Sequence, residues 1–309
     1  MMKRQMRLRV GGLSLLGMLL AFSSLAQHEI LFNWGYDLAH PARTLVLDAE
    51  LNEISGLSLS LDGRELLAIQ DEDGELYFLD PQSGHLNRQV NFWKEGDYEG
   101  IEQVGTAIYV VKSTGTIYEI QQVGTNEQTV EKYNGFLTSD NDIEGLSYWP
   151  QRHQLLLACK SSPGQSMNSN RTKAIYAFDL LSHTFVPEPL LLLQRDSVDR
   201  YLQHCQQEPG YAKICSIFDP TKEDFDLSPA ALAVHPLTGD FYLTSAKGNL
   251  LLVINARGEI HYIAKLPKDL HRQPEGLCFD AQGNLYISNE QNDGLPPLIY
   301  YYPYNPKRS

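Results

Sequence analysis

The sequence predicts an all-β fold, a β-propeller of five blades with four strands in each blade. Three observations predict it: a repeat of about 45 residues, several short strand-like segments within each repeat, and a last repeat that lacks one strand. Short strands at regular spacing with turn residues between them are typical of all-β proteins, and four strands per repeat are typical of a propeller.

Each repeat opens with a small or acidic residue, then Gly or Ala, then an aliphatic residue. The five openers are Ser55-Gly56-Leu57, Glu99-Gly100-Ile101, Glu144-Gly145-Leu146, Ala230-Ala231-Leu232 and Glu275-Gly276-Leu277. A turn and a second strand-like run follow each opener, as at Ile108–Val111, and a third strand follows, as at Thr116–Ile120. Five such units predict five blades.

The fifth repeat has no fourth strand of its own. Its third strand ends at Tyr302, and Pro303 and Pro306 leave no room for another before Ser309. The segment Ala42–Asp48 has the pattern of a strand and belongs to no repeat. We therefore expect this N-terminal strand to complete the fifth blade, which would close the ring and protect the sheet edges.

An insertion of about 40 residues, roughly 190–227, separates the third and fourth repeats. Asp196–Gln207 within it has helical composition, so we expect the insertion to be partly helical. It could cover one blade, or it could cap the channel and meet a partner. Cys205 and Cys215 both lie in the insertion and could form a disulfide in an oxidising compartment.

The first 26 residues have the layout of a secretory signal peptide. Four basic residues precede an apolar run from Val10 to Phe22, and small residues follow it, with Ser24 and Ala26 suited to cleavage after Ala26. The alternative is an uncleaved membrane anchor, although the run is shorter than the ~20 residues of a spanning helix. We expect a protein exported to the periplasm or beyond, with a propeller domain at 27–309 and no transmembrane span.

The chain is acidic, which limits its partners. Its net charge is −13, and removing the signal peptide, with four basic residues and no acidic ones, makes it −17. Such a chain repels phosphate backbones, so nucleic-acid binding is disfavoured and cations are favoured as ligands.

The openers and their neighbours resemble the SdiA-regulated (YjiK-like) family of exported bacterial propellers. The matching segments are Asn52–Leu57, Asp97–Glu102, Asp142–Tyr148, Ser228–Pro236 and Gln273–Leu277. The resemblance covers nearly all of the mature chain and implies a five-bladed propeller with bound Ca²⁺, distantly related to NHL-repeat proteins. The fourth repeat departs from the pattern, because Ala230 stands where three others carry Glu.

Three of the openers place a glutamate at the start of the innermost strand of a blade. Because innermost strands line the channel of a propeller, Glu99, Glu144 and Glu275 are expected around one mouth of it. Carboxylates that converge repel one another and raise one another's pKa. Ca²⁺, which accepts six to eight oxygen ligands, would relieve this repulsion.

Further oxygen donors stand at the ends of the second strands, at Asp71, Asn289 and Glu290. Together with the three glutamates they form the predicted Ca²⁺ site. The alternative is that the glutamates pair with Lys112 and Lys160 and hold the blades together without a metal ion.

Two classes of function fit this chain. The first is a monomeric binding or scaffold protein that presents one face to an unidentified protein or small molecule, with Tyr98 and Tyr148 as candidate contacts. The second is a Ca²⁺-dependent esterase or lactonase, in which the ion would polarise an ester carbonyl. The sequence has no G-x-S-x-G motif and identifies no catalytic residue.

Overall fold

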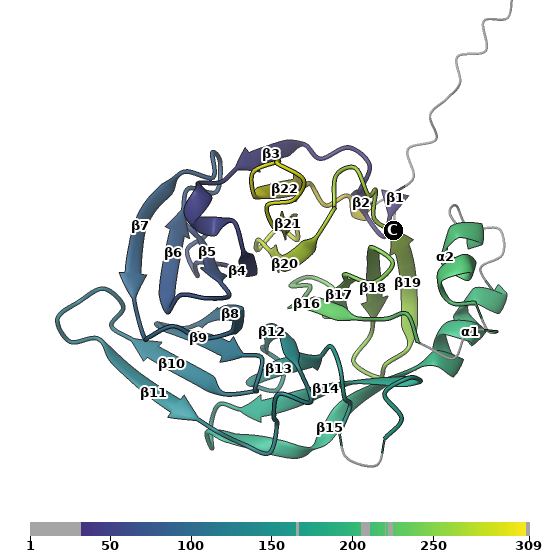
Figure 1. Ribbon diagram of the computed structural model, residues 1–309, viewed down its shortest axis with the longest axis horizontal. Helices are drawn as coiled ribbons and strands as arrows, with labels where there is room; N and C mark the ends of the chain where they lie inside the picture. The colour runs from purple at the N-terminus through teal and green to yellow at the C-terminus, as the bar shows by residue number, and fades with distance from the viewer. Residues whose placement is uncertain (1–31, 165–166, 205–210, 220, 222–224, 307–309) are drawn as a thin grey trace, which may run out of the picture. The chain divides into compact units, whose positions relative to one another are not determined.

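A computed structural model describes residues 32–164, 167–204, 211–219, 221 and 225–306. Five four-stranded antiparallel sheets follow one another around a central axis (Figure 1), which confirms the predicted propeller. The expected signal peptide and its cleavage point lie outside the described residues. No helix in these ranges is long and apolar enough to cross a membrane.

Blades 1 to 4 are built from consecutive strands. Blade 1 contains β4 (Ile54–Leu59), β5 (Leu66–Gln70), β6 (Glu75–Leu79) and β7 (Leu86–Asn91). Blade 2 contains β8 (Tyr98–Val104), β9 (Ala107–Lys112), β10 (Ile117–Gln121) and β11 (Thr129–Tyr133). Blade 3 contains β12 (Ile143–Trp149), β13 (Gln154–Cys159), β14 (Thr172–Asp179) and β15 (Thr184–Gln194). Blade 4 contains β16 (Pro229–Val234), β17 (Phe241–Ser245), β18 (Leu250–Ile254) and β19 (Ile260–Lys265).

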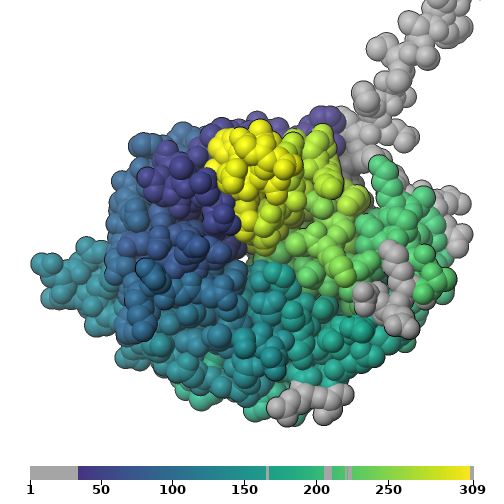
Figure 2. Space-filling model, viewed as in Figure 1, coloured from purple at the N-terminus to yellow at the C-terminus, as the bar shows by residue number. Residues whose placement is uncertain are grey.

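Blade 5 joins the two ends of the propeller, as the sequence predicts. It contains β20 (Pro274–Phe279), β21 (Leu285–Asn289), β22 (Leu298–Tyr302) and the N-terminal strand β3 (Arg43–Val46). The β3–β22 register pairs Val46 with Leu298 and Arg43 with Tyr301. Figure 2 shows the purple N-terminal segment against the yellow C-terminal one. A short hairpin of β1 (Phe32–Asn33) and β2 (Tyr36–Asp37) precedes β3, and a 3₁₀ turn (Ala49–Leu51) leads into β4.

Every innermost strand carries a β-bulge at its opener. In blade 2, Tyr98 pairs with Lys112 and Gly100 with Val111, so Glu99 is the extra residue. The same shift makes the first opener residue the extra one in the other blades, at Ser55, Glu144, Ala230 and Glu275. A bulge leaves its extra residue unpaired and re-aims the side chain. The repeated opener is therefore a repeated bulge.

The glycine after the bulge in blades 2, 3 and 5 allows neighbouring blades to pack closely. A Cβ atom added to Gly100 would lie 2.6 Å from Cβ of Leu146 in the next blade, and one added to Gly145 would lie 2.8 Å from Cβ of Leu232. Across the closure of the ring, a Cβ on Gly276 would lie 2.7 Å from Cβ of Leu57. Each of these innermost strands thus packs its backbone directly against the aliphatic opener residue of its neighbour.

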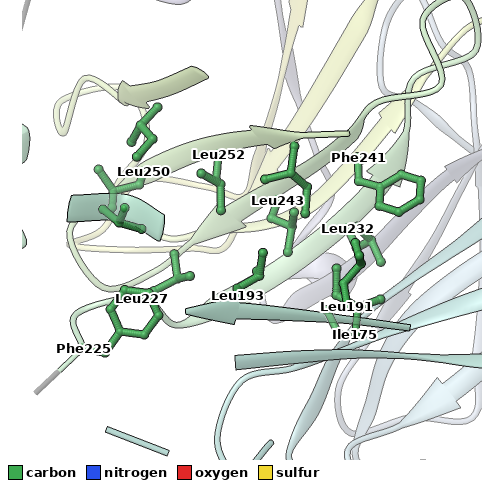
Figure 3. Close-up of a cluster of buried hydrophobic side chains, with 14 of the residues drawn as sticks. Ile175, Leu191, Leu193, Phe225, Leu227, Leu232, Phe241, Leu243, Leu250 and Leu252 are labelled. Atoms are coloured by element: carbon green, nitrogen blue, oxygen red, sulfur yellow. The ribbon is translucent and has the colours of Figure 1, made fainter. Parts of the chain in front are cut away.

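Hydrophobic layers fill the space between blades. Figure 3 shows the layer between blades 3 and 4, where Ile175 and Leu193 of blade 3 face Leu232 and Leu243 of blade 4. Phe225, which precedes β16, completes this layer.

The insertion is partly helical as predicted, and the helical part begins a few residues after the expected boundary of about 190. Residues up to Gln194 continue β15, where Leu191 pairs with Ile175 of β14. Pro187 and Pro189 interrupt the pairing, which an outer strand tolerates.

The helices α1 (Arg195–His204) and α2 (Tyr211–Ile217) lie outside the ring beside β19 (Figure 1). Val198, Leu202 and Ile214 bury their side chains against blades 3 and 4, so the helices cover a blade wall. Cys205, the proposed partner of Cys215, lies outside the described residues.

The close approach at the openers predicts a stability effect. Gly145→Ala should lower the free energy of unfolding by about 1–3 kcal/mol, because its methyl group collides with Leu232 and the neighbouring strand must shift. Denaturant unfolding measures this change.

The fourth blade supplies the control, since Ala231 already carries a methyl group at the equivalent position. Ala231→Gly should cost only about 0.5–1 kcal/mol, the loss of backbone restriction. Equal effects of the two substitutions would contradict the packing argument.

Candidate functional site

The channel along the propeller axis is narrow. Opener residues of all five blades line it, and it encloses only about 10 Å³ of free space. Figure 2 shows how closely the blades meet at the centre of the ring. The channel is therefore a constriction with two ends. We call the end where the innermost strands begin, with Glu99, Glu144 and Glu275, the acidic mouth.

The three bulged glutamates are held in a desolvated cluster. Glu144 and Glu275 are 6% and 8% exposed. Burial, with the charges of Glu144 and Asp97, raises the pKa of Glu99 to about 10. Burial, with the charges of Glu144 and Glu290, raises the pKa of Glu275 to about 8. The charge of Glu144 thus makes the ionisation of both Glu99 and Glu275 less favourable.

Lys160 partly neutralises the cluster. Its Nζ donates to Oε1 of Glu144 at 2.8 Å. Burial alone lowers the pKa of Lys160, but Glu144, Asp142 and Glu275 together raise it above the usual value. Lys112, the other expected partner, instead lies with Nζ 5.4 Å from the centroid of the Tyr98 ring.

The donors on the second strands belong to the same mouth. Burial raises the pKa of Glu290 to about 8, with the charges of Glu53 and Asp71 adding to the effect. Burial and the charges of Glu53 and Glu72 raise the pKa of Asp71. Oδ1 of Asp71 and Oδ1 of Asn289 are both buried and accept no hydrogen bond within the described structure. A buried acceptor without a partner is costly, so these two oxygens are suited to an added donor or cation.

A second set of acidic residues, which were not among the predicted ligands, stands two positions before the bulge. Glu53, Asp97 and Asp142 occupy this position in blades 1, 2 and 3. The hydroxyl of Ser113 donates to Asp97, and that of Ser161 donates to Asp142 at 3.0 Å. In each of these three repeats the acidic residue lies two positions before the first opener residue. This repeated spacing could have identified the set in the sequence.

The donor set matches the chemistry of Ca²⁺, which binds carboxylate and amide oxygens. The side chains do not converge on one point, however. Within the described ranges, no three Asp, Glu, His or Cys side chains are grouped closely enough to hold a metal ion. The arrangement is thus an electronegative mouth with spare oxygen acceptors, whose side chains would have to move inward to coordinate an ion.

The two tyrosines expected to contact a ligand are not brought together here. Tyr98 is fully buried, stacks edge-on against Phe92 and Tyr118, and donates its hydroxyl to the carbonyl of Lys94 at 2.7 Å. It is therefore a core residue rather than a ligand contact. Tyr148 is half-buried, with its hydroxyl 2.8 Å from Nδ1 of His153, and it lines a cavity at the opposite mouth.

A family model described as SdiA-regulated matches residues 35–186 and 219–296, most of the propeller. The chain belongs to the SdiA-regulated family. The matched ranges include every opener and leave out both helices of the insertion. A search of curated proteins finds no match to this member of the family.

Solved structures are similar to this SdiA-regulated protein at low sequence identity. Glutaminyl cyclase from Myxococcus xanthus is 14% identical with a TM-score of 0.54, over 85% of this chain and 94% of that one. A PQQ-bound aldose sugar dehydrogenase from Streptomyces coelicolor is 11% identical with a TM-score of 0.47, over 86% of this chain and all of that one. The likeness to the cyclase concerns the propeller fold alone.

The raised pKa values predict how stability depends on pH. A carboxyl group with a raised folded-state pKa keeps a proton that the unfolded chain loses first, so its stabilising contribution disappears as pH rises. The melting temperature of chelator-treated protein should therefore fall between about pH 5 and pH 9, as Glu275 and Glu290 ionise near pH 8.

Glu275→Gln should make this decline shallower, because an amide does not titrate. Melting temperatures measured across a buffer series test both statements. A melting temperature that is constant or rises over this range would contradict them.

Proposed function

We propose that this SdiA-regulated protein is an exported, Ca²⁺-binding propeller that acts as a binding or scaffold protein. The ion is held at the acidic mouth by Glu99, Glu144 and Glu275, with Asp71, Asn289 and Glu290 as additional oxygen donors. The observation that carries the proposal is the repeated bulge, which directs a glutamate from three different blades to the same desolvated mouth.

The electrostatics of the mouth favour a bound cation. Lys160 offsets the charge of Glu144, but no described residue forms an ion pair with Glu99 or Glu275. A divalent ion would allow these carboxyl groups to ionise at neutral pH, and it would satisfy the unpartnered oxygens of Asp71 and Asn289. Its binding would release protons, because carboxyl groups with a raised pKa must ionise before they can act as ligands.

The place of the ion suggests its role. The candidate ligands come from blades 1, 2, 3 and 5, which the narrow channel already brings together. An ion shared among them would tie the inner ends of these blades and stiffen the loops of that face. Loops set on a rigid ring are a common binding surface in propellers. Export is expected from the N-terminal pattern. Extracellular Ca²⁺ modules have dissociation constants of about 10⁻⁴–10⁻³ M, and the Ca²⁺ concentration outside the cell is high enough to fill such sites.

Calorimetric titration of Ca²⁺ into chelator-treated protein tests the proposal. We expect saturable binding of about one ion, weakened at least tenfold in Glu99→Gln, Glu144→Gln and Glu275→Gln, because each loses a charged ligand. The matched control is Glu127→Gln, which removes an exposed carboxylate from the turn between β10 and β11 and should bind as the wild type does.

Absence of binding in folded protein would contradict the proposal. It would make the glutamates structural partners of Lys160 and of one another. Turnover of an aryl ester or lactone that Glu144→Gln abolishes would instead favour the hydrolase, which has no residue in the described structure to support it beyond the shared mouth.

A further inference from the structure

A cavity lies at the end of the channel opposite the acidic mouth. It has a volume of about 570 Å³, within the usual range for small-molecule sites. All five blades line it with the ends of their innermost strands, through Ser58, Glu102, Tyr148, Val234 and Phe279. The openers close the channel between the two ends, so this cavity is a separate site on the propeller axis.

Glu102, which lines this cavity, is held in place by donors from three blades. Ser58 of blade 1 donates to Oε1 at 2.8 Å, and the backbone N–H of Tyr148 in blade 3 donates to Oε2 at 3.0 Å. The Ser147 hydroxyl and the backbone N–H of Gln103 complete the set at 3.3 and 3.1 Å. These four groups are donors, which a carboxylate accepts and a protonated carboxyl accommodates less well.

The carboxylate of Glu102 has no counter-ion among the described residues. Burial raises the pKa of Glu102, and the four hydrogen bonds only partly offset that effect. Neither Glu102 nor Asp280, a second acidic lining residue, forms an ion pair in the described part of the protein. Asp62 at the rim has an exposed partner in Arg64, 3.5 Å away.

No lysine, arginine or histidine lines the cavity within the described ranges. Arg43 donates to three residues that line the cavity, at the carbonyl of Pro81, Oε1 of Gln82 and the hydroxyl of Tyr286, but does not line it itself. His235 is buried, and burial lowers its pKa to about 4, so it is neutral at pH 7. A cationic ligand would therefore meet no basic side chain in the cavity.

The apolar and aromatic part of the remaining lining favours an organic cation over a hydrated metal ion. Leu59, Leu61, Phe279 and Tyr148 line the cavity together with the acidic residues. Apolar and aromatic groups contact the methyl or methylene groups of an ammonium compound, and aromatic faces attract its charge. A hydrated inorganic ion gains nothing from such a surface.

We propose that the cavity opposite the acidic mouth binds a small organic ammonium ion, with the carboxylate of Glu102 facing its charged nitrogen and the apolar rim contacting its carbon atoms. This site is independent of the proposed Ca²⁺ site and gives the binding function a small-molecule ligand.

Calorimetric titration of choline and of putrescine into the full mature protein tests this inference. Choline carries a permanent charge, and its neutral isostere 3,3-dimethyl-1-butanol has the same shape. We expect saturable binding of at least one of the two cations with a Kd of about 1 mM or below, and at least tenfold weaker binding of the isostere. Glu102→Gln should weaken cation binding at least tenfold.

Because Glu102 also joins three blades, a second variant keeps the test valid if Glu102→Gln fails to fold. Leu61→Lys adds a positive charge at the exposed rim and should weaken cation binding severalfold, more so at low salt. Leu181→Lys is the matched control, since Leu181 is 80% exposed, against 76% for Leu61, and does not line the cavity. It should bind as the wild type does.

Three results would overturn the inference: no saturable binding of either cation to folded protein, equal binding of the neutral isostere, or equal effects of the two lysine variants. Performing the titrations with chelator and again with excess Ca²⁺ separates this site from the acidic mouth. Cation binding that persists in Glu144→Gln would support this site even if the Ca²⁺ proposal fails.

Discussion

The structure depends on the close contact between neighbouring innermost strands at the openers. The glycine after each bulge in blades 2, 3 and 5 lets its backbone lie against the aliphatic residue of the next blade, at distances that a methyl group would prevent. This contact narrows the channel to almost no free volume. It also brings bulged residues from different blades close enough for their charges to interact. The packing of the ring and the chemistry of the acidic mouth are therefore consequences of the same motif.

The same contact separates the two ends of the central channel, which are lined by different kinds of side chain. At the acidic mouth, carboxyl groups crowd one another, with Lys160 as a partial counterion. At the opposite mouth, Glu102 is held by hydroxyl and backbone donors and lines a cavity that also has apolar and aromatic residues. Crowded carboxylates suit a divalent ion that several oxygens can share, whereas a carboxylate beside aromatic and aliphatic groups suits an organic cation. A five-bladed ring offers both environments because its innermost strands begin at one face and end at the other.

Much of the fold could be predicted because it repeats. The openers recur with the same following strands, so the number of blades could be counted, and the missing strand of blade 5 pointed to residues 42–48. The local exceptions could not be predicted. A bulge shifts the alternation of inward and outward side chains, which left Tyr98 in the core although it adjoins Glu99. The continuation of β15 to Gln194 was hard to predict because Pro187 and Pro189 lie within it. Proline is usually excluded from strands that pair on both sides, but an outer strand such as β15 tolerates it.

The candidate site was only partly predictable. The sequence shows which charged residues recur, but it does not show which of their side chains contact one another. The bulged glutamates were found from their repetition, whereas the pairing of Lys160 with Glu144 rather than Lys112 with Glu99 depends on side-chain geometry. The central claim is that the bulged glutamates share one cation. The most direct measurement is a crystal structure with Ca²⁺, with the ion located by its anomalous signal. The account predicts one ion at the acidic mouth with carboxylate oxygens of Glu99, Glu144 and Glu275 at about 2.3–2.6 Å. Well-ordered glutamates with no ion among them, in crystals grown with excess Ca²⁺, would contradict it.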